Sequence, residues 1–303
     1  MKIGYGIGGR TVDQLVAQAQ RAAEDGFTSL WTANIFGLDA IAAMAIVGRE
    51  VPGVHVGTAV TPTYPRHPHA MAQQALTASQ ATGGRFTLGI GLSHQIVIES
   101  MLGLSFDKPA NHMREYLSVL MPLLEEGTVS FDGDLYRVHA PLDRGDDAAR
   151  PPVVLAAMAP VMLRLAGEMA DGTTLWMTGP KTVEQHVAPR INRAAEAAGR
   201  PSPHIYVSLP IAVTETADAL REEAATTFAT YGGLPSYRAM LDEEGAAGPA
   251  DVAIIGDEET VAAGVRAVAD AGATQFNASC FGDGDTVRRT TALLQELRNE
   301  HNS

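Results

Sequence analysis

The sequence predicts one (β/α)8 barrel, the α/β fold in which eight parallel strands alternate with helices around a closed sheet. Its 303 residues, 46% of them apolar, are enough for one barrel core. A local pattern of Ala-rich helix, glycine and short apolar strand recurs in AQRAAEDGFTSLWT, LAGEMADGTTLWMT and AVADAGATQFNAS. Strand-like and helix-like segments alternate along the whole chain, so residues 1–303 are predicted to form a single domain.

Eight segments rich in β-branched and aromatic residues are expected to be the strands. In chain order they are Lys2 to Ile7, Thr28 to Thr32, His55 to Val60, Thr87 to Gly91, Val153 to Ala156, Thr173 to Met177, Ile205 to Val213 and Thr274 to Ser279. An open doubly wound sheet would have the same local units. No Ser- or Pro-rich linker divides the chain into two halves, which favours the barrel.

Helices are expected between these strands, and several of their ends can be read from the sequence. Thr11 is a predicted N-cap, and Pro68, Pro160 and Pro180 suit first turns, where a missing N–H costs nothing. Gly26, Gly172 and Gly272 are each expected to be the left-handed residue that ends a helix before the next strand.

Two stretches interrupt the alternation. Val129 to Val138 predicts a hairpin, because Asp132-Gly133 has turn chemistry between two β-prone runs. Tyr231 to Gly248 predicts a short helix outside the barrel rhythm. Such insertions commonly shape the barrel mouth or an oligomer contact, and a solvated loop with no role is the alternative.

Charge and composition exclude several classes of protein. A net charge of -13 disfavours nucleic acid and anionic membranes as partners. The longest apolar run, Ile41 to Val47, is far shorter than the roughly 18 residues that span a bilayer, and the start has no leader pattern, so we expect a cytoplasmic protein. Cys280 is the only cysteine, which excludes an intramolecular disulfide and a cysteine-based zinc site.

Two motifs favour structural roles over ligand binding. Gly4 to Gly9 matches G-x-G-x-x-G, but only three residues precede it and no acidic residue ends the next strand, so we expect a glycine-tolerant strand rather than a dinucleotide site. His67 and His69 lie two residues apart with no carboxylate nearby. We interpret them as a polar loop and expect no metal site.

The most specific stretch runs from residue 57 to residue 91, GTAVTPTYPRHPHAMAQQALTASQATGGRFTLGIG. It resembles the luciferase-like monooxygenase superfamily, in its coenzyme F420-dependent (deazaflavin) branch. Further matches in the right order are Leu30-Trp31, the REYL string at 114–117, the VSFDGDLYRV hairpin and the ADG string at 170–172. The resemblance implies a bacterial luciferase-like barrel with insertions at its mouth, a small-molecule substrate and a homodimer.

The resemblance also implies how the cofactor is held. A non-prolyl cis peptide bond would form a bulge behind the ring, and by position it joins Ala59 and Val60; an ordinary trans strand is the alternative. After the fifth strand, the small residues Ala156, Ala157, Met158 and Ala159 precede a helix whose N-terminus would take the cofactor phosphate. Plain core packing is the alternative for this run.

Gly91, Leu92 and Ser93 would line the opposite side of the ring, and the residue that follows them, His94, is the acid/base candidate. A purely structural histidine is the alternative. Other residues of the mouth complete the implied site. Asn34, Thr61, Trp176 and Thr178 are expected to bind cofactor, and Tyr5 and His112 to help wall the substrate space.

The sequence also departs from relatives of this superfamily. Its deazaflavin sugar-phosphate dehydrogenases carry an Asp-His pair after strand two and a Glu after strand four, where this chain has Asn34-Ile35 and His94. Ile35 cannot accept a proton, so that alcohol-oxidising pair is absent. The expected reaction is hydride transfer between C5 of F420 (8-hydroxy-5-deazaflavin) and a small organic substrate with an activated C=C or C=N bond, in either direction. The alternatives are an FMN-dependent monooxygenase and a non-catalytic flavin-binding protein.

Overall fold

The computed structural model describes residues 1–145 and 149–300, which form the predicted (β/α)8 barrel. Parallel strands pair in a closed order, with β12 against β1 and β9 against β10 completing the circle. Around the barrel they are β1 (Lys2–Gly6), β2 (Ser29–Thr32), β3 (His55–Thr58), β5 (Phe86–Gly91), β8 (Val153–Leu155), β9 (Gly172–Trp176), β10 (His204–Val213) and β12 (Gln275–Cys280). Each contains or overlaps one of the predicted strands.

Two short strands depart from the prediction. β4 (Thr61–Pro62) follows a break in the third strand of the barrel and pairs with β5. β11 (Ile254–Gly256) pairs with the end of β10 and was not predicted.

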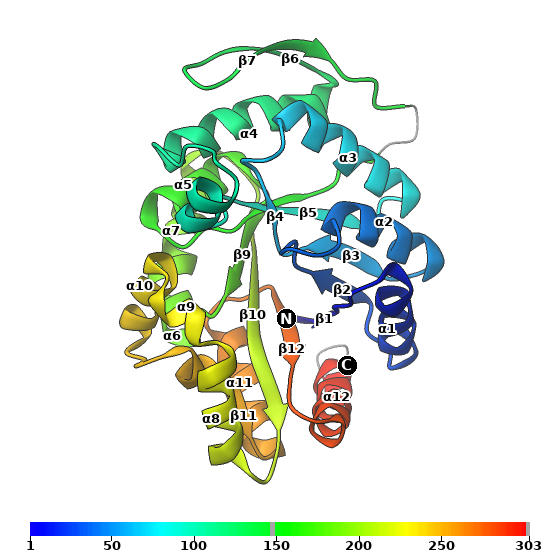
Figure 1. Ribbon diagram of the computed structural model, residues 1–303, viewed down its shortest axis with the longest axis vertical. Coiled ribbons are helices and arrows are strands. Elements are labelled where there is room, and N and C mark those ends of the chain that lie inside the picture. Colours follow the sequence, from blue (N-terminus) through cyan, green and yellow to red (C-terminus); the bar gives the residue numbers. More distant parts are fainter. Residues whose placement is uncertain (146–148, 301–303) are drawn as a thin grey trace.

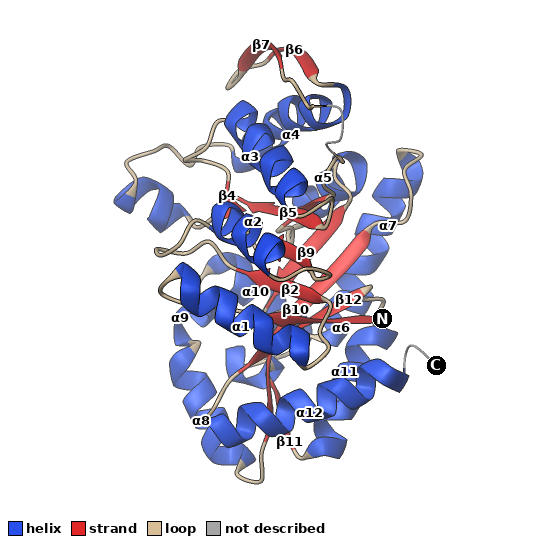
Figure 2. Ribbon diagram, turned by 90° about the vertical axis from the view of Figure 1, so that its right-hand side faces the viewer, coloured by secondary structure: helices blue, strands red, loops and turns tan. Residues whose placement is uncertain are grey.

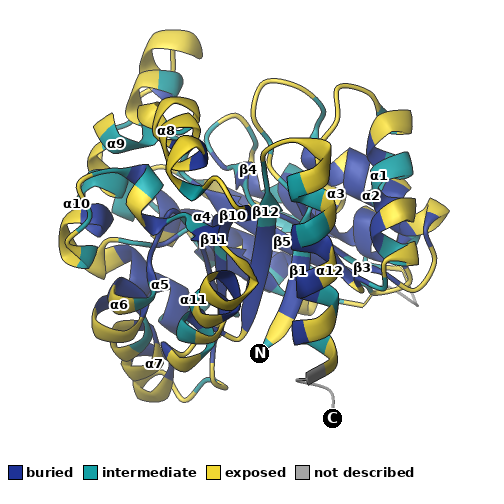
Figure 3. Cartoon of the chain, turned by 90° about the horizontal axis from the view of Figure 1, so that it is seen from below, coloured by how far each residue is buried: buried dark blue, intermediate teal, exposed yellow. Residues whose placement is uncertain are grey.

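Helices surround the strands, with their outer faces exposed and the strands buried at the centre (Figures 1 and 3). The covering helices are α1 (Val12–Glu24), α2 (Ala40–Glu50), α3 (Pro68–Ala81), α4 (Pro109–Glu126), α5 (Pro160–Met169), α6 (Pro180–Thr182) continued by η2 (Val183–Val187) and α7 (Ala188–Ala197), α11 (Glu258–Asp270) and α12 (Gly284–Glu300). Additional helices are η1 (Ile96–Met101), α8 (Ala217–Thr227), α9 (Ala229–Gly233), α10 (Pro235–Glu244) and η3 (Pro249–Val252).

Most of the predicted helix ends are confirmed. The Thr11 hydroxyl accepts the N–H of Gln14, and the three prolines predicted for first turns begin α3, α5 and α6. Gly26 and Gly272 follow α1 and α11 with φ of 85° and 100°. Gly172 is different, because it is the first residue of β9, and a Cβ there would lie 2.2 Å from the carbonyl oxygen of His204. Its prediction as a helix-ending residue was wrong; close strand pairing requires the glycine.

The barrel interior is polar in its lower half and aromatic above it. Gln275 Nε2 donates to Ser29 Oγ at 3.0 Å and to Asn277 Oδ1 at 2.6 Å. A Cβ on Gly4 would lie 2.4 Å from that Asn277 oxygen, which explains a glycine in β1 without any dinucleotide site. Trp31, Val154 and Tyr206 pack above this network.

The predicted hairpin is confirmed as β6 (Thr128–Asp132) paired antiparallel with β7 (Arg137–Pro141). Its turn is held by the buried carboxylate of Glu115 in α4, which accepts backbone N–H groups of Asp134, Leu135 and Tyr136 at 2.8–3.0 Å. The segment 231–248 was expected to hold one short helix. It contains the end of α9 and all of α10, two helices separated at Leu234.

Within residues 1–145 and 149–300, no helix combines the length and apolar character needed to cross a bilayer.

Candidate active site at the barrel mouth

The carboxyl ends of the strands form the mouth of the barrel. Figure 2 shows α9 on the side of the molecule opposite the two termini, which lie toward the amino ends of the strands. The ring centroids of Trp31 and Tyr206 are 5.1 Å apart at 61°, and Val154 and Ala59 pack with this pair. These side chains form the floor of the mouth.

The third strand of the barrel is interrupted at the level of this floor. β3 ends at Thr58, the peptide bond between Ala59 and Val60 is cis as predicted, and β4 begins at Thr61. The Thr58 hydroxyl donates to the carbonyl of Gly89 at 2.8 Å and accepts the Gly89 N–H at 2.9 Å. A side chain therefore replaces backbone in the pairing of β3 with β5, and the chain bulges at Ala59-Val60.

This bulge forms one wall of the mouth with its neighbours. A Cβ on Gly91 would lie 2.7 Å from Cγ2 of Val60 and 3.1 Å from Cβ of Ala156. The absence of a side chain at 91 thus allows Val60 and Ala156 to meet, and Gly91 lies on the side of the bulge, not opposite it as predicted. The wall they form is low and apolar, a surface against which a flat ring can pack.

An aromatic bridge borders the mouth at the ends of β5 and β9; it consists of His94, Tyr237, Tyr231 and Trp176. Successive ring centroids along it are 5.8, 5.1 and 5.9 Å apart. The bridge joins the end of β5 to the end of β9 through α9 and α10 (Figure 1). Sequence analysis left the role of residues 231–248 open, and the structure shows that this insertion shapes the mouth.

His94 begins the segment after β5. Its carbonyl oxygen accepts the N–H groups of Val97 and Ile98, and the preceding Ser93 has a left-handed backbone with φ of 62°. Burial lowers the pKa of His94 below its usual 6.5. The imidazole is therefore neutral near pH 7 and able to accept a proton.

Of the helices that directly follow β8 and β9, only α6 has its N-terminus capped by a side chain. The Glu244 carboxylate accepts the N–H groups of Lys181 and Thr182 at 3.2 and 2.7 Å, so a side chain already fills the start of α6. α5 begins after Ala159, which makes no side-chain cap, and Ala159 and Val161 are exposed. The start of α5 is therefore free to take an anion.

Some buried polar atoms at the barrel centre have no partner within the part of the chain that the structure describes. They include Thr61 Oγ1, next to the bulge, and Asn277 Nδ2, in the barrel interior. Since buried polar groups are nearly always hydrogen-bonded, the Thr61 hydroxyl fits a ligand that brings a hydrogen-bonding partner into the mouth, whereas Asn277 belongs to the network below the floor.

Other predicted site residues are partly engaged. Asn34 Oδ1 accepts the N–H of Ala40 at 3.0 Å. The Thr178 hydroxyl is buried and directed at the carbonyl of Trp176, 3.3 Å away, and at Met158 Sδ, 3.9 Å away. Thr178 and Met158 thus support each other beside the start of α5.

Tyr5 and His112 do not lie as expected. The Tyr5 hydroxyl is 3.4 Å from Thr291 of α12, so the Tyr5 side chain points outward from β1 toward the helix layer. The prediction that Tyr5 is a wall of the mouth was therefore wrong. His112 is buried, 3.0 Å from the Thr63 hydroxyl and stacked on Tyr64 at 3.9 Å. Burial lowers the pKa of His112 to about 4, which makes it a neutral packing residue near pH 7.

The histidines of the RHPH string have structural contacts. His67 caps α3 and accepts the N–H of His69, whose Nε2 is 3.3 Å from the carbonyl of Pro141. Across the described ranges, no group of three His, Cys, Asp or Glu side chains is placed to hold a metal ion.

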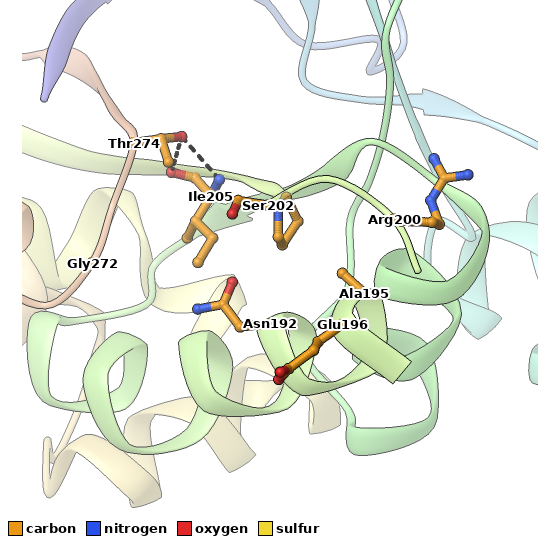
Figure 4. A pocket seen from close by; sticks show the side chains of 9 residues that line it. Asn192, Ala195, Glu196, Arg200, Ser202, Ile205, Gly272 and Thr274 are labelled. Carbon is orange, nitrogen blue, oxygen red and sulfur yellow. Dashed lines mark hydrogen bonds between the residues drawn. The ribbon is translucent and has the colours of Figure 1, made fainter. Parts of the chain in front are cut away.

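One cavity lies at the amino ends of the strands. It has a volume of about 480 Å³ and is shown in Figure 4. Its lining residues are Asn192, Ala195, Glu196, Arg200, Ser202, Pro203, Ile205, Gly272 and Thr274. Because barrel enzymes carry out their chemistry at the carboxyl ends, this cavity is not the candidate active site.

A second cavity, of about 330 Å³, lies at the carboxyl ends of β1 and β2, beside the mouth rather than over the bulge. Its lining residues are Ile7, Gly8, Gly9, Leu15, Thr32, Ala33, Ile35, Gly37, Leu38, Ala40 and Ala43. Sequence reasoning missed both this cavity and the aromatic bridge. Tyr231 and Tyr237, placed in an insertion, were the available signal for the bridge.

Comparison with known proteins gives a family match over most of the chain. The model of the family described as luciferase-like monooxygenase matches residues 2–275. A Mycobacterium tuberculosis protein, named as a candidate coenzyme F420-dependent oxidoreductase, is 34% identical over 193 residues, or 57% of this chain and 54% of that protein. The chain thus matches only about half the length of this relative. A 5,10-methylenetetrahydromethanopterin reductase of Methanolobus tindarius is 26% identical over 239 residues, or 78% and 72%.

Solved structures show the same fold at low identity. The coenzyme F420 dependent tetrahydromethanopterin reductase of Methanopyrus kandleri has a TM-score of 0.82 and 20% identity, with 100% of both chains covered. An F420-dependent secondary alcohol dehydrogenase gives 0.77 and 20%, covering 98% and 99%. A Baeyer-Villiger monooxygenase of Pseudomonas putida, in complex with FMN, gives 0.76 and 15%, covering 99% and 97%.

Proposed function

The chain belongs to the luciferase-like monooxygenase family, and from that premise we propose that it is a coenzyme F420-dependent oxidoreductase acting on a small organic substrate. One observation carries the proposal: the mouth has an apolar wall at Ala59, Val60 and Gly91, with the unpaired Thr61 hydroxyl beside it. That combination suits a flat ring with a polar edge. Of the two relatives found by sequence, one is named as a candidate oxidoreductase and the other as a reductase.

A bound deazaflavin would supply a hydride at C5, without the oxygen adduct that a flavin forms at C4a. The bulge would support one face of its ring, and the uncapped start of α5 would take its phosphate. The residues proposed to hold it are Asn34, Ala59, Val60, Thr61, Gly91, Leu92, Ser93, Ala156, Ala157, Met158, Ala159, Trp176 and Thr178.

His94 is proposed to exchange a proton with the substrate. Its neutral ring is the member of the aromatic bridge next to the end of β5, half-buried and packed on Tyr237. A positioned imidazole of this kind typically contributes about 10²- to 10⁴-fold to a rate. Keeping the imidazole neutral allows it to act as a base, and the protonated form would act as an acid in the reverse direction.

Ligand titration of the full-length protein tests the cofactor. Its two tryptophans, Trp31 and Trp176, both lie at the mouth, so their fluorescence reports on a ring bound there. We expect quenching by oxidised and reduced F420 at concentrations at least about tenfold below those needed for FMN, a difference of about 1.4 kcal/mol. Tighter FMN binding, with oxygen consumption by the reduced complex, would instead make the protein an FMN-dependent monooxygenase.

Turnover is measured with reduced F420 and 2-cyclohexen-1-one, an uncharged activated C=C compound. The His94→Gln variant is expected to bind F420 within about twofold of the unmodified protein and to lose about 10²-fold or more in rate. Tight F420 binding with no oxidation by this compound or other activated C=C and C=N acceptors would identify a non-catalytic binding protein and contradict the proposal.

A further inference from the structure

Exposed apolar side chains gather around the candidate site. Among the described residues, nine large apolar side chains are exposed, and seven of them follow β2, β5 or β8 at the carboxyl ends of these strands. The seven are Ile35, Phe36, Ile96, Met101, Leu102, Leu104 and Val161. Single exposed apolar residues need no explanation, whereas a concentration of them on one face marks a binding surface.

The cavity at the ends of β1 and β2 continues this apolar surface inward. Ile35, 64% exposed, belongs to both, and none of the cavity's eleven lining residues carries a charged or titratable side chain. Thr32, the lining residue with a polar side chain, pairs in register with Thr58, directly before the bulge. The cavity is therefore one strand away from the proposed ring position.

Two of the charged side chains next to the cavity are already engaged, and Arg10, which follows the lining residue Gly9, is exposed to solvent. Asp39 caps α2 by accepting the N–H of Ala42, and it forms an ion pair with Arg66. Arg66 Nη2 also lies 3.4 Å from Asn34 Oδ1. No counter-charge in this group is left for an ionised ligand, whose desolvation would go uncompensated.

We propose that the substrate is an uncharged molecule with a hydrocarbon portion, which lies in this cavity while its reactive bond faces the ring and His94. This inference rests on the proposed function. A volume of about 330 Å³ is at the small end of ligand sites, which suits a chain or ring of a few carbons. Each buried methylene is expected to raise affinity by about fourfold until the cavity is full.

Calorimetric binding to the full-length protein tests the pocket without relying on turnover. The probes are pentan-2-one, heptan-2-one, nonan-2-one and heptanoate, each with and without F420. We expect affinity to rise with ketone length by at least about twofold per methylene. Heptanoate is expected to bind at least about tenfold more weakly than heptan-2-one, because its charge has no partner in the cavity. Equal binding of these two, or affinity independent of length, would overturn the proposal.

Variants locate the binding. Ala33→Leu, at an exposed lining position, is expected to weaken nonan-2-one binding by about tenfold or more through occupation of the cavity. Ala198→Leu, at an exposed position after α7, is the matched control and should leave binding unchanged. Identical ketone affinities for Ala33→Leu and the unmodified protein would place the binding elsewhere and contradict the proposal.

A second copy of the chain could also cover the apolar surface, and a further pair of variants separates this outcome. Ile35→Ser should weaken ketone binding without a change of mass in light scattering, while Leu135→Ser, 50% exposed at the hairpin turn, should change neither. Loss of a dimer in Ile35→Ser with ketone binding intact would overturn the proposal. If ketones bind as expected but F420 does not, the proposed cofactor fails and the pocket preference stands.

Discussion

At the scale of the residue, the protonation of His94 depends on a neighbour from the insertion. Burial lowers the pKa of His94, and the Tyr237 ring is 5.8 Å from its imidazole. Removing that ring in Tyr237→Ala should admit water and raise the His94 pKa toward 6.5. Tyr237→Phe retains the ring and should leave the pKa where it is.

The measurement is a proton NMR titration of the histidine ring signals, assigned with His94→Gln. In Tyr237→Ala the acid limb of the pH–rate profile should move to higher pH together with the titration midpoint, since the base then loses its neutral form earlier. A midpoint that stays the same in both tyrosine variants would show that the bridge does not control the protonation of His94.

Individual residues also show where sequence reasoning reached its limit. The bulge at Ala59-Val60 was located because a long string around it resembles a family. The outward direction of Tyr5 follows from strand alternation, but the alternation has to be counted from a residue whose face is known. His94 was predicted at the rim, yet its contact with Tyr237 joins positions 143 residues apart (237 minus 94), and no local pattern encodes such a contact.

At the scale of the element, the hairpin β6–β7 is attached to the barrel through one carboxylate. Burial opposes ionisation of Glu115, but the backbone N–H groups of Leu135, Tyr136 and Asp134 and the Asn111 amide outweigh it and lower the pKa of Glu115. A lowered folded pKa means that this stabilisation is fully present above the unfolded value of 4.5. It is lost as the pH falls through the folded value.

Glu115→Gln should therefore lower the free energy of unfolding at pH 7 by about 1 to 3 kcal/mol, the range for charged hydrogen bonds. The loss should shrink at pH 3, where the unmodified protein has begun to protonate Glu115. Urea unfolding at the two pH values measures both effects. Glu126→Gln, exposed at the end of the same helix, is the control. An equal loss at both pH values would exclude the charge as the cause.

The elements differ in how well the sequence specifies them. The eight barrel strands, the helices that begin with proline and the hairpin carry strong local signals, and all were predicted. β11, an addition to the eight-strand pattern, was missed, and α9 with α10 was reduced to one helix because Gly232 and Gly233 obscured the pattern. The pairing of Glu244 with the start of α6 is tertiary and has no local signature.

At the scale of the whole molecule, the closed barrel was predictable because every unit repeats the same local order of helix and strand. The interior was less predictable. Polar residues of β2 and β12, Ser29, Gln275 and Asn277, form a network deep in the barrel, although the surrounding strands appear apolar in sequence. Two histidines, the partly buried His55 and the buried His112, belong to the same class of hidden polar residue, and they make stability depend on pH.

Burial lowers the pKa of both His55 and His112 to about 4 in the folded protein, against 6.5 when unfolded. Between those values only the unfolded chain binds the extra protons, so the free energy of unfolding should fall as the pH drops from 6.5 toward 4. The slope is at most about 1.4 kcal/mol per pH unit for each histidine.

Urea unfolding at pH 7, 6, 5 and 4.5 measures this slope. His112→Asn should be less stable at pH 7 but have a shallower slope, whereas His139→Asn, at an exposed position in β7, should keep the slope of the unmodified protein. An unchanged slope in His112→Asn would mean that His112 is already protonated in the folded state, which its stacking on Tyr64 and its burial argue against.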